Sequence, residues 1–372
     1  MHRMFRFAAL RRHAHRGALI ALAILACSRA GAQDFAARVA HYVQQRAPAP
    51  FNGVILVANS SGVVLHQAYG VAGADLGVAL RPDHLFGIGS LTKPITAAAV
   101  MRLVERGALR LTDSVCNFLT PCPAAWRSVT LAHVLGHTSG IPDYFGELPA
   151  APVDSTRAII DRAAQRHLQD SLLSAPGTHY RYSNFNYVLV GYAMEVATGQ
   201  RWESVLRAEI LGPAGMEDTR YDDVWAIIPG RVRGYTMESG TLRHIRYRDH
   251  SAYAAGGLLS SASDLLRFDR ALTGGALMSD SSFRRMTTPG YGEYGLGWQI
   301  TRQFGRTVRN HTGGTNGFAS HLATYDDGLT IIVLSNVESE AAKATACDIA
   351  ALYHGLRLSE RGAGQPACRR DA

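Results

Sequence analysis

The sequence predicts an α+β protein: an antiparallel sheet flanked by helices, with a mainly helical domain inserted into it. Apolar, β-branched runs occur near both ends of the 372 residues, whereas residues 110–250 hold mostly loops and helical patterns. Such runs predict strands, and strands at both ends can share one sheet when the chain between them forms a second unit. We therefore predict a discontinuous sheet domain over 33–109 and 251–358, with a helical domain over 110–250.

The first 32 residues are typical of an export signal. Five arginines precede an apolar run at Gly17–Cys27, and Ala30-Gly31-Ala32 offers the small residues that a signal peptidase requires. We expect a signal peptide over 1–32 with cleavage after Ala32, and a periplasmic or secreted protein. The run is short for a bilayer span. An uncleaved anchor and a lipid on Cys27 are the alternatives.

The high formal charge belongs largely to this N-terminal segment. Residues 1–32 hold six arginines and no acidic residue, so removing them lowers the formal charge from +8 to +2. No lysine or arginine tract follows, and we expect no nucleic-acid partner. With 47% hydrophobic and 18% charged residues, the composition is that of a globular protein with a substantial core.

The elements of the first sheet segment follow in order after the signal. A helical pattern covers 35–45. Val54–Ala58 and Val63–Tyr69 flank four turn-forming residues, which predicts a hairpin. Apolar residues spaced three and four apart then predict a helix that starts at or near Ser90 and ends at Gly107.

Two more helices are expected in the inserted region, at 156–172 and 187–198. Strand patterns then return in three segments: Tyr294–Arg302, Ser320–Tyr325 and Thr330–Ser335. The last two flank an Asp-Asp-Gly turn, which predicts a second hairpin. A closing helix over 341–354 precedes a polar tail at 359–372.

Four cysteines remain after removal of the signal, and an even number in an exported chain permits two disulfides. Cys116 and Cys122 flank a short loop that contains proline, so they are natural partners. Cys347 and Cys368 would then tie the tail to the last helix. Free buried thiols are the alternative, because sequence alone does not establish connectivity.

The chemistry is expected at Ser90-Leu91-Thr92-Lys93. At a helix start, Lys93 lies about one turn beyond Ser90 on the same face. A serine hydroxyl becomes a nucleophile when a neighbour takes its proton, and a lysine held neutral by burial can do this. The helix start also directs backbone N–H groups towards a reacting carbonyl. By itself the pattern is common, and a capped surface helix is its alternative interpretation.

Two further motifs complete the candidate site. In Tyr182-Ser183-Asn184, the phenol can shuttle a proton and the amide can hold Lys93 and a substrate. In His311-Thr312-Gly313-Gly314, small residues let a substrate backbone lie along a strand. Gly314 could offer its N–H to an oxyanion, and Thr312 could bind a carboxylate or carbonyl. Taken singly, these motifs could equally be an aromatic turn and a glycine-rich hairpin.

Competing chemistries have weaker support. The sequence has no His-Glu-x-x-His zinc helix, no Gly-x-Ser-x-Gly elbow and no phosphate-binding glycine loop. His133 and His137 are four residues apart, but Gly136 weakens a helix between them, so we expect structural roles for both. We expect no metal and no cofactor.

The order and spacing of the three motifs resemble those of the penicillin-recognising serine hydrolases. More narrowly, the chain is similar to class C β-lactamases, D-Ala-D-Ala carboxypeptidases and related esterases. Further phrases match at Phe86-Gly87-Ile88-Gly89, from Leu135 to Tyr144, and from Ala255 to Leu265. The resemblance implies an antiparallel sheet flanked by helices, a mainly helical domain, and a site between them.

The resemblance also implies an acyl-serine mechanism without a cofactor. Ser90 would be the acylated nucleophile, Lys93 its base partner and Tyr182 the general acid and base. Asn184 and His311-Thr312-Gly313 would bind substrate, and the N–H groups of Ser90 and Gly314 would form the oxyanion hole. The sequence has no counterpart to the deacylating glutamate of class A enzymes, so Tyr182 would serve both half-reactions.

His311 departs from the lysine of typical β-lactamases. A neutral imidazole binds a carboxylate less firmly than an ammonium does, so efficient β-lactam hydrolysis is not implied. We expect a small-molecule or peptide substrate, such as one derived from peptidoglycan: a D-Ala-D-Ala-type peptide, a β-lactam or an ester, with a carboxypeptidase or β-lactamase-like hydrolase favoured over a pure esterase. A carboxylesterase of the same fold and a non-catalytic penicillin-binding or sensor protein are the alternatives. A membrane partner is expected only if the N-terminal segment is retained or lipidated.

Overall fold

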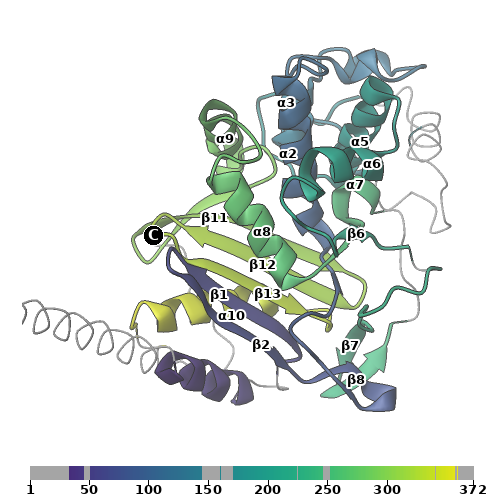
Figure 1. Cartoon of the computed structure of the whole chain (residues 1–372). Coiled ribbons are helices and arrows are strands. Elements are labelled where there is room, and N and C mark those ends of the chain that lie inside the picture. The colour runs from purple at the N-terminus through teal and green to yellow at the C-terminus, as the bar shows by residue number, and fades with distance from the viewer. Residues whose placement is uncertain are drawn as a thin grey trace, which may run out of the picture.

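A six-stranded antiparallel sheet forms the centre of the protein, in the order β10-β11-β12-β13-β1-β2 (Figure 1). The structure is a computed structural model that describes residues 33–45, 51–144, 160, 171–223, 225–245, 252–339, 341–356 and 358. The strands are β1 (Gly53–Asn59), β2 (Gly62–Tyr69), β10 (Gln299–Gln303), β11 (Arg306–Thr315), β12 (Phe318–Tyr325) and β13 (Thr330–Ser335). Strands from both ends of the chain therefore meet at the β1–β13 pair.

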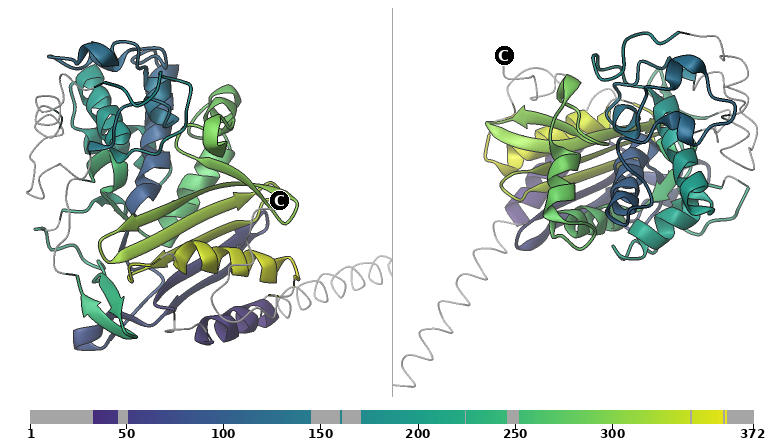
Figure 2. Two further views of the ribbon diagram at one scale, coloured as in Figure 1. Left: turned by 180° about the vertical axis from the view of Figure 1, so that it is seen from behind. Right: turned by 90° about the horizontal axis from the view of Figure 1, so that it is seen from above.

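Helices cover both faces of this sheet (Figure 2). One face packs against a helix over residues 33–44 and α10 (Ala341–Tyr353), the other against α2 (Thr92–Glu105) and α8 (Ala262–Thr273). Alternate residues of β1 enter the two cores, with Val54 and Leu56 on one side and Ile55 and Val57 on the other. Because both faces of β1 and β13 are covered, these two strands are apolar along most of their length.

A largely helical region stands beside one end of the sheet (Figure 1). Its helices are α3 (Leu131–Leu135), α5 (Asn184–Thr198), α6 (Trp202–Leu206) and α7 (Tyr253–Gly256). Helix α2 contacts α5 and α7 and so joins this region to the sheet. Helix α9 (Asp280–Thr287) also contacts α2.

Small elements complete the described chain. The short strands are β3 (Val71–Gly73), β4 (Val78–Ala79), β5 (Phe86–Gly87), β6 (Arg220–Tyr221), β7 (Tyr235–Glu238), β8 (Thr241–His244) and β9 (Leu258–Ser260). They form two hairpins, β3-β4 and β7-β8, and a three-stranded sheet, β5-β9-β6. The single-turn helices are η1 (Ala74–Leu76), η2 (Gly89–Leu91), η3 (Val115–Asn117), η4 (Ala124–Trp126), η6 (Arg207–Leu211) and η7 (Tyr291–Glu293).

The predicted fold class is confirmed, with local differences. The strand predicted at Tyr294–Arg302 begins only at Gln299, because the N–H of Gly295 bonds to the carbonyl of Trp298 and closes a turn. Gly297, at φ 82°, supplies the left-handed residue of that turn. Strands β6, β7 and β8 lie within the region that was expected to be mainly helical.

Several sequence predictions fall outside the described residues. They are the signal segment 1–32, nearly all of the helix at 156–172, and the tail at 359–372. Cys116 and Cys122 form a disulfide with their Cα atoms 5.4 Å apart. Cys347 is buried in α10, but Cys368 lies in the tail, so that pairing stays a prediction. Within the described ranges, no helix is long and apolar enough to cross a membrane.

A buried ionic network anchors α8 to three strands. Asp269 of α8 accepts hydrogen bonds from Arg309 of β11, Thr324 of β12 and Thr330 of β13. The Arg309 guanidinium lies 4.9 Å from the ring centroid of Trp298. This network fixes β11, the strand that carries His311 to Gly314.

Candidate active site

Two glycines bring β11 against the turn that carries Ser90. Gly89 has φ 50°, and a Cβ atom there would lie 2.6 Å from the carbonyl oxygen of Gly314. A Cβ atom on Gly313 would lie 2.1 Å from the carbonyl oxygen of Ile88. The Ser320 hydroxyl donates to that same carbonyl at 2.7 Å. Only glycine at both positions permits this close contact between strand and turn.

Lys93, in the first turn of α2, is fully buried beside Ser90. Its Nζ lies 2.9 Å from Ser90 Oγ, 2.7 Å from Asn184 Oδ1 and 2.7 Å from the carbonyl oxygen of Ala255. Burial lowers the pKa of Lys93 to about 7, against an opposing effect of the Asp143 charge. A substantial fraction of Lys93 is therefore neutral near pH 7.

Counting hydrogens shows where the free electron pair of neutral Lys93 points. The amide oxygen of Asn184 and the carbonyl oxygen of Ala255 only accept hydrogen bonds. They take both hydrogens of a neutral amine, which leaves the lone pair for the hydroxyl hydrogen of Ser90. The three partners thus arrange Lys93 as a proton acceptor for Ser90.

Tyr182 and Asn184 are held at the start of α5. The Asp143 carboxylate accepts hydrogen bonds from the backbone N–H groups of Asn184 and Phe185 and from the hydroxyl of Ser183. The Tyr182 hydroxyl contacts Ser90, and its ring centroid lies 4.9 Å from Lys93 Nζ. Burial raises the pKa of Tyr182 well above its usual value, so the phenol keeps its proton at neutral pH.

His311 lies in the same cluster but points its polar atoms at protein partners. Its Nδ1 is 2.8 Å from the carbonyl of Thr312 and must donate there, so Nε2 accepts the hydrogen of the Tyr294 hydroxyl at 2.9 Å. Burial, together with the Lys93 charge, lowers the pKa of His311 to about 3. His311 is therefore neutral, with both ring nitrogens engaged, and offers a substrate no cation.

The rest of the third motif lies where the sequence places it. The Thr312 hydroxyl is 2.9 Å from Nδ1 of His321, its cross-strand neighbour on β12. Gly313 is buried against Ile88, whereas Gly314 is exposed with open space where a side chain would stand. The structure thus gathers Ser90, Lys93, Tyr182, Asn184 and the His311 strand. The direction of the Ser90 and Gly314 N–H groups towards an oxyanion stays a prediction.

Four contributors to this cluster have no individual sequence signal: the carbonyl of Ala255, Asp143, Tyr294 and His321. The two matching phrases from Leu135 to Tyr144 and from Ala255 to Leu265 contain the first two of them. The carbonyl of Ala255 follows Tyr253, which has φ 35° and is buried. Tyr294 contacts His311, and His321 contacts Thr312. These contacts depend on how the strands and turns pack, which residue type alone does not reveal.

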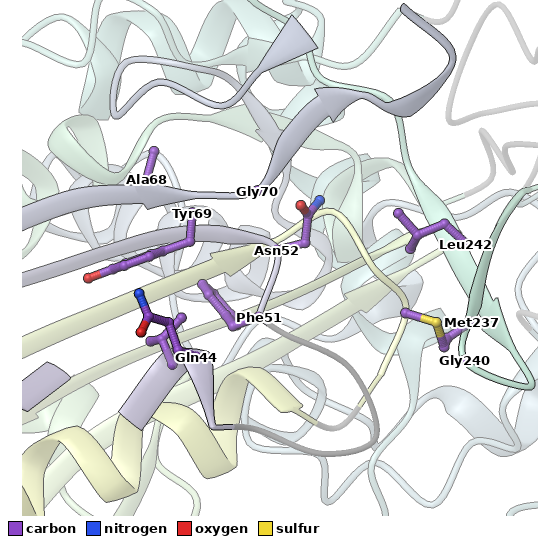
Figure 3. Close-up of a pocket in the computed structure, with 10 residues that line it drawn as sticks. Gln44, Phe51, Asn52, Ala68, Tyr69, Gly70, Met237, Gly240 and Leu242 are labelled. Atoms are coloured by element: carbon purple, nitrogen blue, oxygen red, sulfur yellow. The ribbon is translucent and has the colours of Figure 1, made fainter. Parts of the chain in front are cut away.

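Other candidate sites have less chemical support. Among the described residues, no group of three His, Cys, Asp or Glu side chains could hold a metal ion. A cavity of about 550 Å³ lies between the helix over 33–44, β2 and the β7-β8 hairpin (Figure 3). Its described lining includes Phe51, Asn52, Tyr69 and Met237 and none of the gathered site residues. The Asn52 side chain already bonds to the backbone of Val71.

The fold and the cluster around Ser90 define a serine hydrolase of the β-lactamase fold. The profile of the family described as Beta-lactamase matches residues 49–356. The chain belongs to this family.

Proteins with similar sequences or structures support this family assignment. Penicillin-binding protein 4* of Bacillus subtilis (strain 168) is 32% identical over 317 residues, covering 78% of this chain and 69% of that protein. D-aminopeptidase of Gluconobacter oxydans (strain 621H) is 28% identical over 339 residues, covering 86% of this chain but only 62% of that protein. The crystal structure of a penicillin-binding protein from Bacillus halodurans shares the fold, with a TM-score of 0.71 at 24% identity, over 82% of this chain and 95% of that one.

Proposed function

We propose that the protein is an exported serine hydrolase that cleaves amide or ester bonds through an acyl-Ser90 intermediate. The observation that carries the proposal is the buried Lys93 amine, whose two acceptor-only partners leave its lone pair for the Ser90 hydroxyl. Tyr182, Asn184 and the β11 strand complete the machinery around the reacting carbonyl. The similarity to a D-aminopeptidase supports a D-amino-acid-containing acyl donor.

Acylation uses the proton positions described above. Neutral Lys93 takes the Ser90 proton while Oγ attacks the substrate carbonyl. The oxyanion forms beside the N–H groups of Ser90 and Gly314, an interaction for which one donor typically contributes about 10²–10³-fold in rate. The leaving group departs with the proton of the Tyr182 phenol, and Tyr182 recovers a proton from Lys93.

Deacylation reverses the proton path. Water enters where the leaving group stood and gives its proton, through Tyr182, to neutral Lys93. The hydroxide attacks the ester carbonyl, and Ser90 regains its proton as the acid leaves. Tyr182 and Lys93 thus serve both half-reactions.

Strand β11, which carries His311, favours substrates without a carboxylate on the leaving group. His311 is neutral and both its nitrogens bond to protein, so the position that carries an ammonium in typical β-lactamases supplies no charge here. We therefore rank amides and esters with uncharged leaving groups above D-Ala-D-Ala carboxylates and β-lactams. Penicillins should acylate Ser90 slowly.

The decisive experiment is intact-protein mass spectrometry after incubation with a fluorophosphonate and, separately, with benzylpenicillin. We expect one fluorophosphonate adduct in the wild type and none in Ser90→Ala. The kcat/KM values of a D-alanyl amide, a nitrophenyl ester and a D-Ala-D-Ala peptide then rank the substrates. An adduct in Ser90→Ala, or no adduct and no turnover in the folded wild type, would contradict the proposal.

Export is a separate part of the proposal, supported by the sequence of residues 1–32. N-terminal sequencing of protein recovered from outside the cytoplasm should start at Gln33. A start at Met1 would indicate an anchor, and a blocked Cys27 would indicate a lipid.

A further inference from the structure

His137 occupies an unusual position at the edge of the candidate site. It follows Gly136 at the end of α3 and has φ 56°, in the left-handed region. Such a conformation is unfavourable for a residue other than glycine, although histidine and asparagine adopt it more readily than most. The imidazole is fully buried.

The contacts of the ring determine its tautomer. Its Nδ1 accepts the backbone N–H of Ser183 at 3.2 Å and faces the Asn186 amide nitrogen at 3.4 Å. Because Nδ1 is an acceptor, the hydrogen of the neutral ring lies on Nε2. Nε2 is buried and has no hydrogen-bond partner among the described residues. An unpaired buried donor is unfavourable, so this residue bears a second unfavourable contribution.

The same ring lies against Tyr182. The two ring centroids are 4.3 Å apart with the planes inclined by 37°. Tyr294 packs on His137 at 4.8 Å and Tyr187 at 5.3 Å. His137 therefore holds Tyr182 at two points: its ring directly, and its backbone through the N–H of the next residue, Ser183.

We propose that His137 is a positioning residue that aims the Tyr182 hydroxyl at the leaving group. The inference rests on the proposed function, in which Tyr182 supplies the proton that the leaving group needs. It does not give His137 a proton-transfer role. Burial and the nearby Lys93 charge hold the pKa of His137 well below its usual value, so the ring is neutral at pH values near 7. Misplacing the phenol by about 1 Å can cost about 10²-fold in rate.

The test exploits how strongly leaving groups depend on a proton. An anilide needs protonation to depart, whereas a nitrophenolate departs without it. For one D-alanyl acyl group, His137→Gly should lower kcat/KM for the p-nitroanilide about 10²-fold and for the p-nitrophenyl ester only a few-fold. Tyr182→Phe should show the same asymmetry, and the double variant should be no worse than Tyr182→Phe. Glycine suits the left-handed backbone, so the fold should persist.

Two further variants make the result unambiguous. His137→Asn keeps an acceptor near the Nδ1 position for Ser183 but removes the ring, so its anilide activity should fall between wild type and His137→Gly. His133→Asn, in the same segment but outside the cluster, should match the wild type on both substrates. Equal losses on anilide and ester, wild-type activity in His137→Gly, or additive losses in the double variant would overturn the inference. Wild-type protein inactive on both substrates would instead overturn the proposed function.

Discussion

At the scale of single residues, removal from water determines the chemistry of the site. Lys93 is an ordinary lysine by sequence, yet burial brings its pKa to about 7 and leaves it able to accept a proton. The same burial keeps Tyr182 protonated and His311 neutral. One desolvated cluster thus holds a base, Lys93, an acid, Tyr182, and a neutral imidazole, His311.

The Lys93 pKa predicts a pH-dependent stability. Below pH 7 the folded protein buries a charged ammonium, while between about 7 and 10.5 only the unfolded chain is protonated. The unfolded state then binds more protons, so wild-type stability rises with pH over this window. Lys93→Met should be inactive yet more stable than wild type by about 1–4 kcal/mol at pH 6.

Urea denaturation at pH 6 and pH 9 checks this prediction. The advantage of Lys93→Met should shrink at the higher pH. A stability difference that does not change with pH would show that Lys93 is not desolvated in the fold.

His311 makes a prediction about specificity. In His311→Lys an ammonium replaces the neutral ring, and a substrate carboxylate gains a partner. We expect the kcat/KM ratio of a D-Ala-D-Ala carboxylate to its C-terminal amide to rise about tenfold, equivalent to about 1.4 kcal/mol. His244→Lys adds the same charge on the exposed β8 strand and is the control. An unchanged ratio in His311→Lys would remove this position from substrate selection.

At the scale of elements, the contact between β11 and the turn before α2 sets the geometry of the site. Gly313 and Gly314 are neighbours on one strand, but Gly313 is buried and Gly314 is exposed. A Cβ atom on Gly313 would strike Ile88, whereas on Gly314 it would meet open space. The pair therefore offers a matched experiment.

Gly313→Ala should push β11 away from the turn, because overpacking typically costs about 1–3 kcal/mol. We expect a lower melting temperature and loss of most turnover. Gly314→Ala should melt like wild type and lose activity only by crowding substrate. Equal melting temperatures for wild type and Gly313→Ala would contradict this prediction, because they would show that the turn and β11 can move apart without loss of stability.

The periodicity of apolar residues predicts helices and strands that bury one face. It fails where tertiary contacts determine where an element begins or ends. The β1-β2 and β12-β13 hairpins, α2 and α10 all lie close to their predicted ranges. The strand expected from Tyr294 starts late, because two glycines form a turn that an apolar pattern conceals. In the site, residue type pointed to Ser90 and Lys93. The Ala255 carbonyl and the His137 ring could not be predicted in this way, because their places in the site depend on which parts of the chain the fold brings together.

At the scale of the molecule, the sheet joins the two ends of the chain. β13 lies between β12 and β1, with Gly53 paired to Ser335 and Ala58 to Thr330. A chain that ends at residue 329 leaves β1 without this partner and exposes apolar residues on both faces. We expect it to be insoluble or protease-sensitive, whereas a chain ending at residue 358 should fold. A folded, protease-resistant 1–329 product would contradict this.

The position of β13 also sets the order of events as the protein is made. Ser90 and Lys93 leave the ribosome before β11 and β13, which follow only after the helices α3 to α9. Until then Ser90 in η2 and Lys93 in the first turn of α2 have no strand to face, and no surface on which an acyl donor could be held. A growing chain is therefore expected to be inert, and reactivity towards neighbouring esters and amides should begin only once β11 and β13 have been released.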